Sequence, residues 1–505
     1  MRRLIAGLSF VFVAHCSLGA RAAGEIEAWP QFRGPNAAGV AADDQPLPVE
    51  FGPDKNIAWK TAIPAGHSSP CLWGDRVFLT AFDTGTKRLE VLCLDRRDGR
   101  ILWRQPVAAE KLEHVHQISS PATATPAADA ERVYCYFGSV GLICFDHDGQ
   151  EQWKVPLALP RRMFGSGTSP VVAGELVLLS RDERPDPHLW AFDRRTGAVV
   201  WKQKYEVQSG FGPPQDGYAT AVVRDNQVIV HRASEIAAYG LADGQRTWWV
   251  RVNSNGATTP VLRDGLIYVA TWNNFGEPEL RVEMPSFAKL IEQHDKDQDG
   301  RLSKDEFPGD LALSRRPDTS ADQGGEIMAK WFFDRIDANQ DGHVASLEWT
   351  GAVALLRLML GPSEHGLLAI KLGGEGDVTH THVAWREQRN IPEVPSPLEY
   401  QGRVYMVRNG GILTCLEASS GKLLFRSRLE APGSYYSSPV SGDGKVYTAS
   451  QEGRIVVLAA GDRLEVLARN DLGEPVFATP AIAGGTLYVR TEADLWAFRA
   501  HAESP

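Results

Sequence analysis

A Ser/Thr-Pro pair recurs along the chain, each time directly before an apolar, strand-like segment. Counting Thr220-Ala221, which stands in the same frame, the pair occurs eight times, at intervals of 39 to 56 residues with one exception of 137 residues. Repeats of about 40–50 residues are typical of four-stranded propeller blades. The spacing therefore predicts an all-β, eight-bladed β-propeller with an insertion in its fifth blade. The complete pairs are Ser69-Pro70, Thr125-Pro126, Ser169-Pro170, Thr259-Pro260, Ser396-Pro397, Ser438-Pro439 and Thr479-Pro480.

A large aromatic residue follows a glycine turn at a constant distance in most repeats. Glycine takes the positive φ that a tight hairpin needs. The aromatic residue stands four positions later, on the outermost strand, where we expect its ring to pack against the neighbouring blade. The pairs are Gly99/Trp103, Gly149/Trp153, Gly197/Trp201, Gly244/Trp248 and Gly421/Phe425.

The last repeat supplies only three strands before the chain ends. The segment "NIAWKTAI", residues 56–63, precedes the first repeat and has the outer-strand pattern, with Trp59 at its centre. We expect it to complete the last blade, since a closed ring leaves no sheet edge exposed.

The segment "AFDRRTGAVVW", from Ala191 to Trp201, fits the A-x-D-x-x-T-G-x-x-x-W docking motif at every defined position. With "WPQFRGP" at Trp29, "GHSSP" at Gly66 and "GEGDVTHTHVAW" at Gly374, it resembles the secreted PQQ-like (quinoprotein-type) propellers. The resemblance implies two kinds of activity. Some relatives bind pyrroloquinoline quinone beside calcium and oxidise alcohols or sugars, and others are scaffolds in outer-membrane protein assembly.

The long interval falls between "GLIYVATW" and "GLLAIKLGG", which read as the second and third strands of blade five. The predicted organisation is a signal peptide (1–22), a first part of the propeller (23–275), an α-helical EF-hand lobe (276–364), a second part of the propeller (365–500) and a tail (501–505).

The insertion contains the loop "DKDQDGRLSKDE", which has the spacing of an EF-hand. Calcium prefers about seven oxygen ligands, and this spacing folds short carboxylates round one point while a longer glutamate closes the shell. Ser303 can hold a bridging water and, with Glu306, cap an exiting helix that Pro308 would shorten. The predicted ligands are Asp295, Asp297, Asp299, the Arg301 carbonyl, Ser303 and Glu306.

A second loop, "DANQDGHVASLE", repeats the scheme 42 residues later. Leu302 and Val344 hold the same position in the two loops, where paired EF-hands share a short β contact. The second loop carries fewer carboxylates and has Ala345 at the water-binding position, so we expect it to bind calcium more weakly. Its predicted ligands are Asp337, Asn339, Asp341, the His343 carbonyl and Glu348. Apolar helical faces are predicted before the loops, at Phe287, Leu290, Ile291 and His294 and at Met328, Trp331, Phe332 and Ile336.

The N-terminus has two arginines, an apolar stretch and a small-x-small site at Ala20-Arg21-Ala22, typical of a signal peptide. Lipoprotein cleavage at Cys16 is the alternative, against which His15 stands as a bulky residue before the cysteine. We expect a periplasmic or extracellular protein without a transmembrane segment after processing.

Five cysteines remain after processing, too few for a disulfide framework. Cys135 and Cys144 are either a cross-strand disulfide or two small core residues. The net charge of −10 is spread along the chain, which argues against a nucleic-acid partner.

Loops between second and third strands share a face with the Ser/Thr-Pro segments, so we expect the calcium lobe to stand over that face and a protein or small-molecule ligand to bind there. No catalytic constellation is evident. We expect a calcium-binding scaffold or binding protein; the alternative is a calcium-dependent quinoprotein oxidoreductase, for which PQQ-binding residues cannot be named. Polar and aromatic candidates on the face are His67, His114, His116, Arg162, Tyr218, Tyr435 and Tyr436.

Overall fold

The computed structural model describes residues 27–183, 185–205, 217–273, 277, 282–315, 326–359 and 365–500. The predicted signal peptide (1–22), with Cys16, and the predicted tail (501–505) lie outside these residues.

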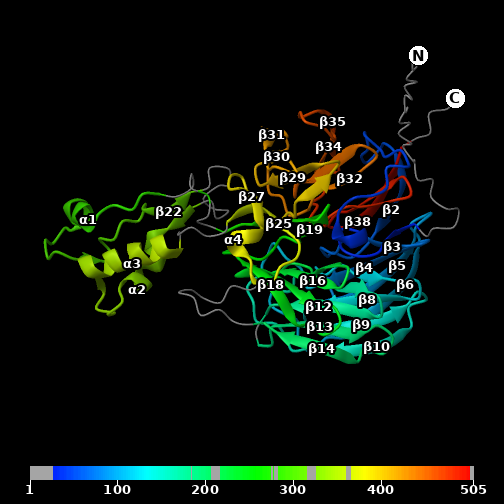
Figure 1. Ribbon diagram of the computed structural model, residues 1–505, viewed down its shortest axis with the longest axis horizontal. Helices are drawn as coiled ribbons and strands as arrows, with labels where there is room; N and C mark the ends of the chain where they lie inside the picture. The colour runs from blue at the N-terminus through cyan, green and yellow to red at the C-terminus, as the bar shows by residue number, and fades with distance from the viewer. Residues whose placement is uncertain are drawn as a thin grey trace, which may run out of the picture.

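Within the described residues, eight antiparallel blade sheets follow one another round a ring, which Figure 1 shows nearly face-on. The predicted all-β, eight-bladed propeller is confirmed. Blade one has β3 (Cys71–Trp73), β4 (Arg76–Asp83), β5 (Arg88–Asp95) and β6 (Ile101–Val107), with β1 (Ala28–Trp29) beside β3; blade two has β7 (Ala127–Ala128), β8 (Arg132–Phe137), β9 (Gly141–Asp146) and β10 (Glu151–Pro156). Blade three has β11 (Val171–Ala173), β12 (Leu176–Arg181), β13 (His188–Asp193) and β14 (Val199–Lys204); blade four has β15 (Val222–Arg224), β16 (Gln227–His231), β17 (Glu235–Gly240) and β18 (Arg246–Arg251), with β26 (Gly376–Asp377) parallel to β18.

The remaining blades contain the insertion and the closure of the ring. Strand β2 (Ile57–Ala62) pairs antiparallel with β38 (Asp494–Arg499), from Ile57 opposite Phe498 to Ala62 opposite Asp494, and so stands in the place predicted for residues 56–63. Blade five has β19 (Val261–Arg263), β20 (Leu266–Thr271), β25 (Gly366–Lys371) and β27 (Val383–Glu387), the last preceded by α4 (Thr379–His382); blade six has β28 (Leu398–Tyr400), β29 (Arg403–Arg408), β30 (Ile412–Glu417) and β31 (Leu423–Arg428). Blade seven has β32 (Val440–Gly442), β33 (Lys445–Ala449), β34 (Arg454–Ala459) and β35 (Val466–Asp471); blade eight has β36 (Ala481–Ala483), β37 (Thr486–Arg490), β38 (Asp494–Arg499) and β2 (Ile57–Ala62).

The structure explains why a hydroxyl residue precedes each inner strand. The hydroxyl oxygen of Thr125 accepts a hydrogen bond from the backbone N–H of Ser69, and Ser169 accepts one from Thr125 in turn, at 2.9 and 3.0 Å. Seven such bonds join the eight positions in order from Ser69 to Thr479 within the described residues. Thr220, which no proline follows, keeps its place in this chain of bonds. The repeat therefore encodes a continuous chain of hydrogen bonds that links the eight blades in order.

Five tryptophans each join their blade to the next one. The indole Nε1 of Trp153 in blade two donates to the carbonyl oxygen of Arg194 in blade three at 3.1 Å. Gly197 follows in the same turn with φ +72°, and a Cβ there would lie 2.7 Å from the Trp153 ring. The predicted packing against a neighbouring blade is confirmed. The same pairing joins Trp59 to Gly99, Trp103 to Gly149, Trp201 to Gly244 and Trp385 to Gly421.

The N-terminal segment after β1 connects blades that are far apart round the ring. Pro30 accepts a hydrogen bond from Ala128 in blade two, and Ala41 donates one to Ser441 in blade seven. Between them, the 3-10 helix η1 (Pro35–Ala37) contacts blade four. The guanidinium of Arg33 is fully buried and donates to the Pro397 carbonyl of blade six at 2.7 Å. This segment thus braces the ring from within, which the sequence did not reveal.

Cys135 and Cys144 are two separate core residues in the structure and do not form the cross-strand disulfide that was the alternative. Cys135 lies opposite Ile143, and Cys144 lies opposite Tyr134. Because neighbouring residues of a strand point to opposite faces, the two thiols lie on different sides of the sheet, in different hydrophobic clusters. Both are free and buried.

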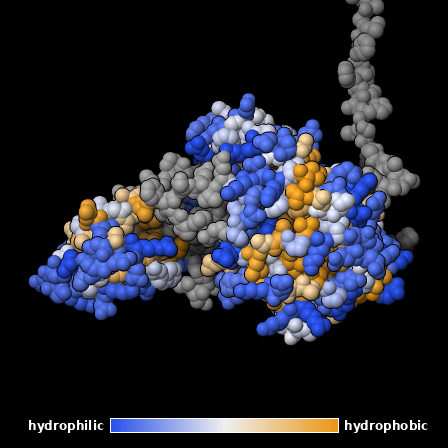
Figure 2. Space-filling view, turned by 90° about the horizontal axis from the view of Figure 1, so that it is seen from below, coloured by the Kyte–Doolittle hydropathy of each residue, from blue (hydrophilic) through white to orange (hydrophobic). Residues whose placement is uncertain are grey.

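The inserted lobe has its own small core and lies outside the ring, beside blade five, in Figure 1; Figure 2 shows it projecting from one side of the propeller. The expectation that it stands over the Ser/Thr-Pro face is therefore wrong. Leu290, Phe333 and Trp349 are buried in its core. Its elements are α1 (Phe287–His294), β21 (Leu302–Ser303), β22 (Ala312–Arg315), β23 (Glu326–Met328), η4 (Ala329–Phe332), α2 (Phe333–Ile336), β24 (His343–Val344) and α3 (Ser346–Met359).

The helices flanking the first loop differ from the prediction at one end. Helix α1 enters the loop, and Ser286 caps it by accepting from the Lys289 amide. No helix leaves it: turns run from Lys304 to Glu306, and the next element is β22. Pro308, which lacks an amide hydrogen, accounts for the missing helix.

The helix predicted before the second loop is shorter than the pattern suggested. Met328 belongs to β23, and Trp331 is 60% exposed, so these two residues do not share a buried face with Ile336. Phe333 takes the buried place instead, because the chain turns through η4 before α2 begins.

Candidate calcium centre and propeller face

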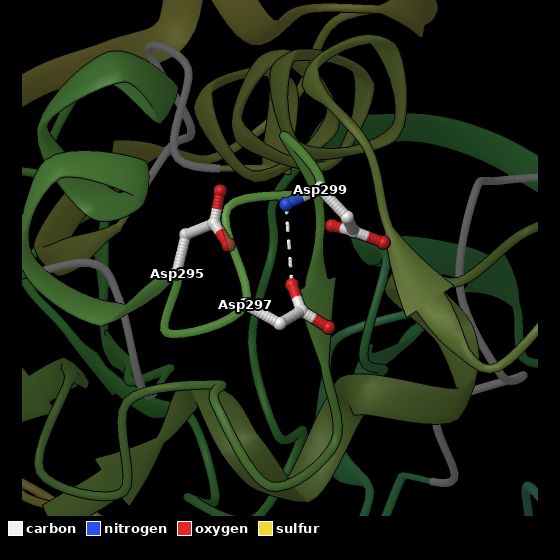
Figure 3. A group of neighbouring side chains, drawn as sticks. All are labelled: Asp295, Asp297 and Asp299. Atoms are coloured by element: carbon white, nitrogen blue, oxygen red, sulfur yellow. Dashed lines mark hydrogen bonds between the residues drawn. The ribbon is translucent and has the colours of Figure 1, made fainter.

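The first loop gathers three aspartates round one point. Figure 3 shows Asp295, Asp297 and Asp299 side by side, and one carboxylate oxygen of each lies within 4.8 Å of the others. Asp295 accepts from the Gly300 amide at 3.0 Å and Asp297 from the Asp299 amide at 3.2 Å. Gly300, with φ +80°, makes the turn that lets these amides point inward.

Glu306 closes this loop from the other side. Its Oε1 accepts from the Lys296 amide at 2.9 Å, and its Oε2 accepts from the amide and the hydroxyl of Ser303 at 3.0 and 2.7 Å. These hydrogen bonds, above all the one from the Ser303 hydroxyl, lower the pKa of Glu306 to about 2. The carboxylate is therefore ionised at any physiological pH, as a calcium ligand must be.

The second loop has the same internal geometry. Asp337 accepts from the amides of Gly342 and Asp341 at 2.9 and 3.1 Å, and Asn339 accepts from Asp341 at 2.8 Å. Glu348 reaches back to the amides of Ala338 and Ala345 at 3.0 and 2.9 Å, as Glu306 does in the first loop.

The two loops lie back to back. Strands β21 and β24 pair antiparallel, with Leu302 opposite Val344, as the shared loop position predicts. Both side chains are fully buried in the core of the lobe. The pairing fixes the distance and orientation between the two loops.

The donor set fits calcium better than other common metals. All donors are oxygens, and within the described residues no histidine or cysteine joins the aspartate group. One oxygen of Asp295, Oδ1, is buried without a hydrogen-bond partner. A metal ion would supply the partner that this oxygen lacks.

On the propeller, four of the sequence candidates lie near one another on the face over blades two to four. The Arg162 guanidinium stacks 3.9 Å from the ring centre of Tyr218. Phe164 meets the Tyr218 ring edge-on at 6.0 Å, and His116 lies 5.1 Å from Phe164. A depression of about 820 Å³ is lined by Arg162 and His114, among others.

Arg162 belongs to a buried cluster of charged side chains beneath the depression. Arg162 and Arg181 both bind Glu183, at 2.5 and 2.8 Å, and the Tyr136 hydroxyl donates to the same carboxylate at 2.9 Å. All four side chains are at least nine-tenths buried. The sequence contains no local signal for this cluster, because its members come from three separate segments.

Glu113 is a buried carboxyl of this region whose pKa is raised well above its usual range. It lines the same depression and is 5% exposed, with Oε2 accepting from the Ser166 amide at 2.8 Å and Oε1 without a partner. Burial, with a smaller contribution from the charge of Glu183, raises the pKa of Glu113 to about 7. A buried carboxyl that titrates near neutrality in a depression is a feature of functional sites. Sequence analysis did not identify this residue.

The other candidates lie on the opposite side of the same face. The His67 ring stacks on the Phe477 ring, with 4.2 Å between the ring centroids. The Tyr436 ring also stacks on Phe477, with 5.6 Å between the centroids. Phe477 could have been found in the sequence, since all three residues stand three positions before a repeat proline. Burial lowers the pKa of His67 to about 3, which keeps it neutral. Tyr435, by contrast, is buried in the core and donates to the Ala431 carbonyl.

Comparison with known proteins agrees with the fold. The family model described as outer membrane protein assembly factor BamB, a PQQ-like repeat model, matches residues 40–184, 185–282, 381–464 and 410–502, more than half of the chain. The chain belongs to this family. An EF-hand model matches residues 287–307, which include α1 and the first loop.

The relatives within and beyond this family are distant. Outer membrane protein assembly factor BamB of Yersinia pestis is 24% identical over 256 residues, covering 45% of this chain. The chain spans 59% of that protein's length, less than two thirds. The structure of BamB from Moraxella catarrhalis has a TM-score of 0.50 at 13% identity, covering 88% of this chain and 99% of that one. A europium-containing methanol dehydrogenase has a TM-score of 0.56 at 11% identity, covering 94% and 98%. Such identities show a common fold alone.

None of the helices among the described residues combines the length and the apolar character needed to cross a bilayer.

Proposed function

We propose that this protein is an exported, calcium-binding propeller that acts as a binding or scaffold protein in the periplasm or outside the cell. The observation that carries the calcium part is the pair of back-to-back loops, whose carboxylates are already held by inward-pointing amides. The predicted signal peptide (1–22) supports export. The EF-hand and BamB-type family matches agree with this proposal.

Calcium would be held in the first loop by Asp295, Asp297, Asp299, the Arg301 carbonyl and Glu306, with a water at Ser303. The second loop would use Asp337, Asn339, Asp341, the His343 carbonyl and Glu348. Four carboxylates against three make the first loop the tighter site. Because the lobe has its own core, the bound ions stabilise the lobe and not the ring.

The test combines calorimetry with limited proteolysis. Glu306→Gln and Glu348→Gln together remove one charge and the bidentate ligand from each loop. We expect them to weaken calcium binding by at least tenfold and to abolish calcium-dependent protection of the lobe, residues 276–364, while the propeller stays folded. Glu292→Gln, which alters an exposed glutamate of α1 outside both loops, is the matched control. Unfolding of the whole protein would contradict the separate-lobe model, and unaltered binding would contradict the ligand assignment.

The ligand or partner surface that the geometry favours is the face over blades two to four. It offers a depression with a cationic rim, Lys111 and Arg161, above the buried pair Glu113 and Arg162. Lys111 and Arg161 form no ion pair with any residue that the structure describes. A cationic rim that is not internally neutralised favours an acidic group on the molecule that binds there.

A quinoprotein oxidoreductase is the second candidate, favoured by the common fold with the methanol dehydrogenase and by the stacked rings of His67, Phe477 and Tyr436. The described part of the propeller, however, holds no group of three metal-ligating side chains, and the buried cysteines are free. The described part of the propeller therefore gives this candidate no set of acidic, histidine or cysteine ligands for an ion beside a quinone. Titration with pyrroloquinoline quinone in excess calcium, followed by tryptophan fluorescence, separates the two candidates, since stoichiometric binding would favour the oxidoreductase.

A further inference from the structure

One cation of the lobe faces both predicted calcium loops. Arg301 holds position 7 of the first loop, where its backbone carbonyl is a predicted ligand. Its Nη2 lies 3.2 Å from Oδ2 of Asp299 in its own loop, and its Nη1 lies 3.4 Å from Oδ2 of Asp341 in the second loop. Each aspartate stands at position 5 of its loop. The guanidinium thus bridges equivalent ligands of the two sites.

The backbone makes this bridge possible. Arg301 directly precedes β21, and Asp341 lies two residues before β24, so the Leu302–Val344 pairing brings the two residues together across the lobe. The Arg301 amide also donates to Oδ1 of Asp299 at 2.8 Å, and the His343 amide donates to Oδ1 of Asp341 at 2.9 Å. In both aspartates one oxygen is therefore held by the backbone and the other faces the arginine.

We propose that Arg301 is an internal cation shared by the two loops, which lowers the calcium affinity of both and links them. This inference rests on the proposed calcium binding. Without calcium, the guanidinium neutralises part of the charge of two carboxylates that would otherwise repel each other. With calcium bound in the first loop, the ion repels the guanidinium from Asp299 toward Asp341. The guanidinium then neutralises more of the Asp341 charge. Because the second loop has only three carboxylates, its net negative charge falls by a larger fraction than that of the first loop.

The size of the effect follows from the distances. Calcium sits about 2.4 Å from its ligand oxygens, so a bound ion and the guanidinium are roughly 5 Å apart. In water, with the screening of about 0.15 M salt, the repulsion between a double and a single charge at that distance changes a binding constant by about fivefold. The side chain is 43% exposed, so a water-like dielectric is appropriate. The change should grow as salt is lowered.

The test is Arg301→Gln, which keeps the backbone carbonyl and removes the charge. We expect calorimetry on the full-length mature protein to show tighter calcium binding at both sites, by about fivefold, with a larger change at the weaker site. Lys304→Gln is the matched control, because Lys304 pairs with Asp334, which belongs to neither loop, at 2.9 Å. It should alter affinity by less than twofold.

A second readout separates this role from a structural one. In EDTA, Arg301→Gln should lower the melting temperature of the lobe, since Asp299 and Asp341 then repel each other. In excess calcium, the same variant should melt at or above the wild-type temperature. A residue that merely holds the lobe together would lower both melting temperatures, and that result, or unchanged affinities, would overturn the inference. Failure of the wild-type protein to bind calcium would overturn the proposed function together with it.

Discussion

Replacing Thr125 by valine removes one link from the chain of hydrogen bonds that joins the blades. The Thr125 hydroxyl accepts the backbone N–H of Ser69 at 2.9 Å, and both residues are only 2% exposed. Valine has nearly the same shape, so packing is retained while the Ser69 N–H loses its acceptor. A buried donor without a partner costs about 1–3 kcal/mol. We therefore expect the propeller to lose about 2 kcal/mol of stability.

The measurement is urea unfolding followed by tryptophan fluorescence. A chain of this size should have an m-value of roughly 4 kcal/mol/M, above the range of small proteins, so 2 kcal/mol corresponds to a midpoint lower by about 0.5 M. Because a chain of 505 residues does not unfold in a single two-state step, midpoints of the propeller transition are compared, and not extrapolated free energies.

Thr125→Ser is the matched control for this experiment. It keeps the hydroxyl acceptor and removes only a buried methyl group, which costs about 1 kcal/mol. Its midpoint should therefore lie between those of the wild type and the valine variant. If the valine variant is as stable as the serine variant or more so, the inter-blade hydrogen bond does not contribute, and the explanation of the Ser/Thr-Pro repeat is refuted.

Two further predictions concern the blade contacts and the buried carboxyl. In urea unfolding, Gly197→Ala should destabilise the propeller by about 1–3 kcal/mol more than Gly174→Ala. Both glycines have positive φ, but only a Cβ at position 197 would meet the Trp153 indole ring. Equal losses of stability would mean that the indole ring moves aside and that its contact with Gly197 is not tight. Glu113 has a pKa raised from 4.5 to about 7, so the folded state binds the proton more tightly and the contribution of Glu113 to stability falls as pH rises from about 4.5 to about 7. Glu113→Gln should therefore be neutral near pH 4.5 and stabilising by about 2–3 kcal/mol at pH 8, and a pH-independent difference between variant and wild type would contradict this assignment.

Local spacing was sufficient for much of this protein. The interval between Ser/Thr-Pro pairs predicted the blades, because a four-stranded blade needs a nearly constant length of chain. The loop from Asp295 to Glu306 predicted the aspartate cluster, because a chelating loop places its own ligands by their order in the chain. The helix expected after the first loop is absent, because Pro308 follows too soon for a helix to form.

Tertiary structure decided what depends on residues distant in the chain. The spacing of Gly197 from Trp201 is visible in the sequence, yet the ring that packs on Gly197 is that of Trp153, from the preceding repeat. Glu113 lies close enough to feel the charge of Glu183 only because the connection between blades one and two and the loop between β12 and β13 meet on one face. The lobe lies beside blade five and not over the face, and it packs its apolar side chains into its own core. The spacing of residues within the insertion does not determine this position. Sequence spacing records the contacts within a repeat or a loop, whereas contacts between them exist only once the ring has closed.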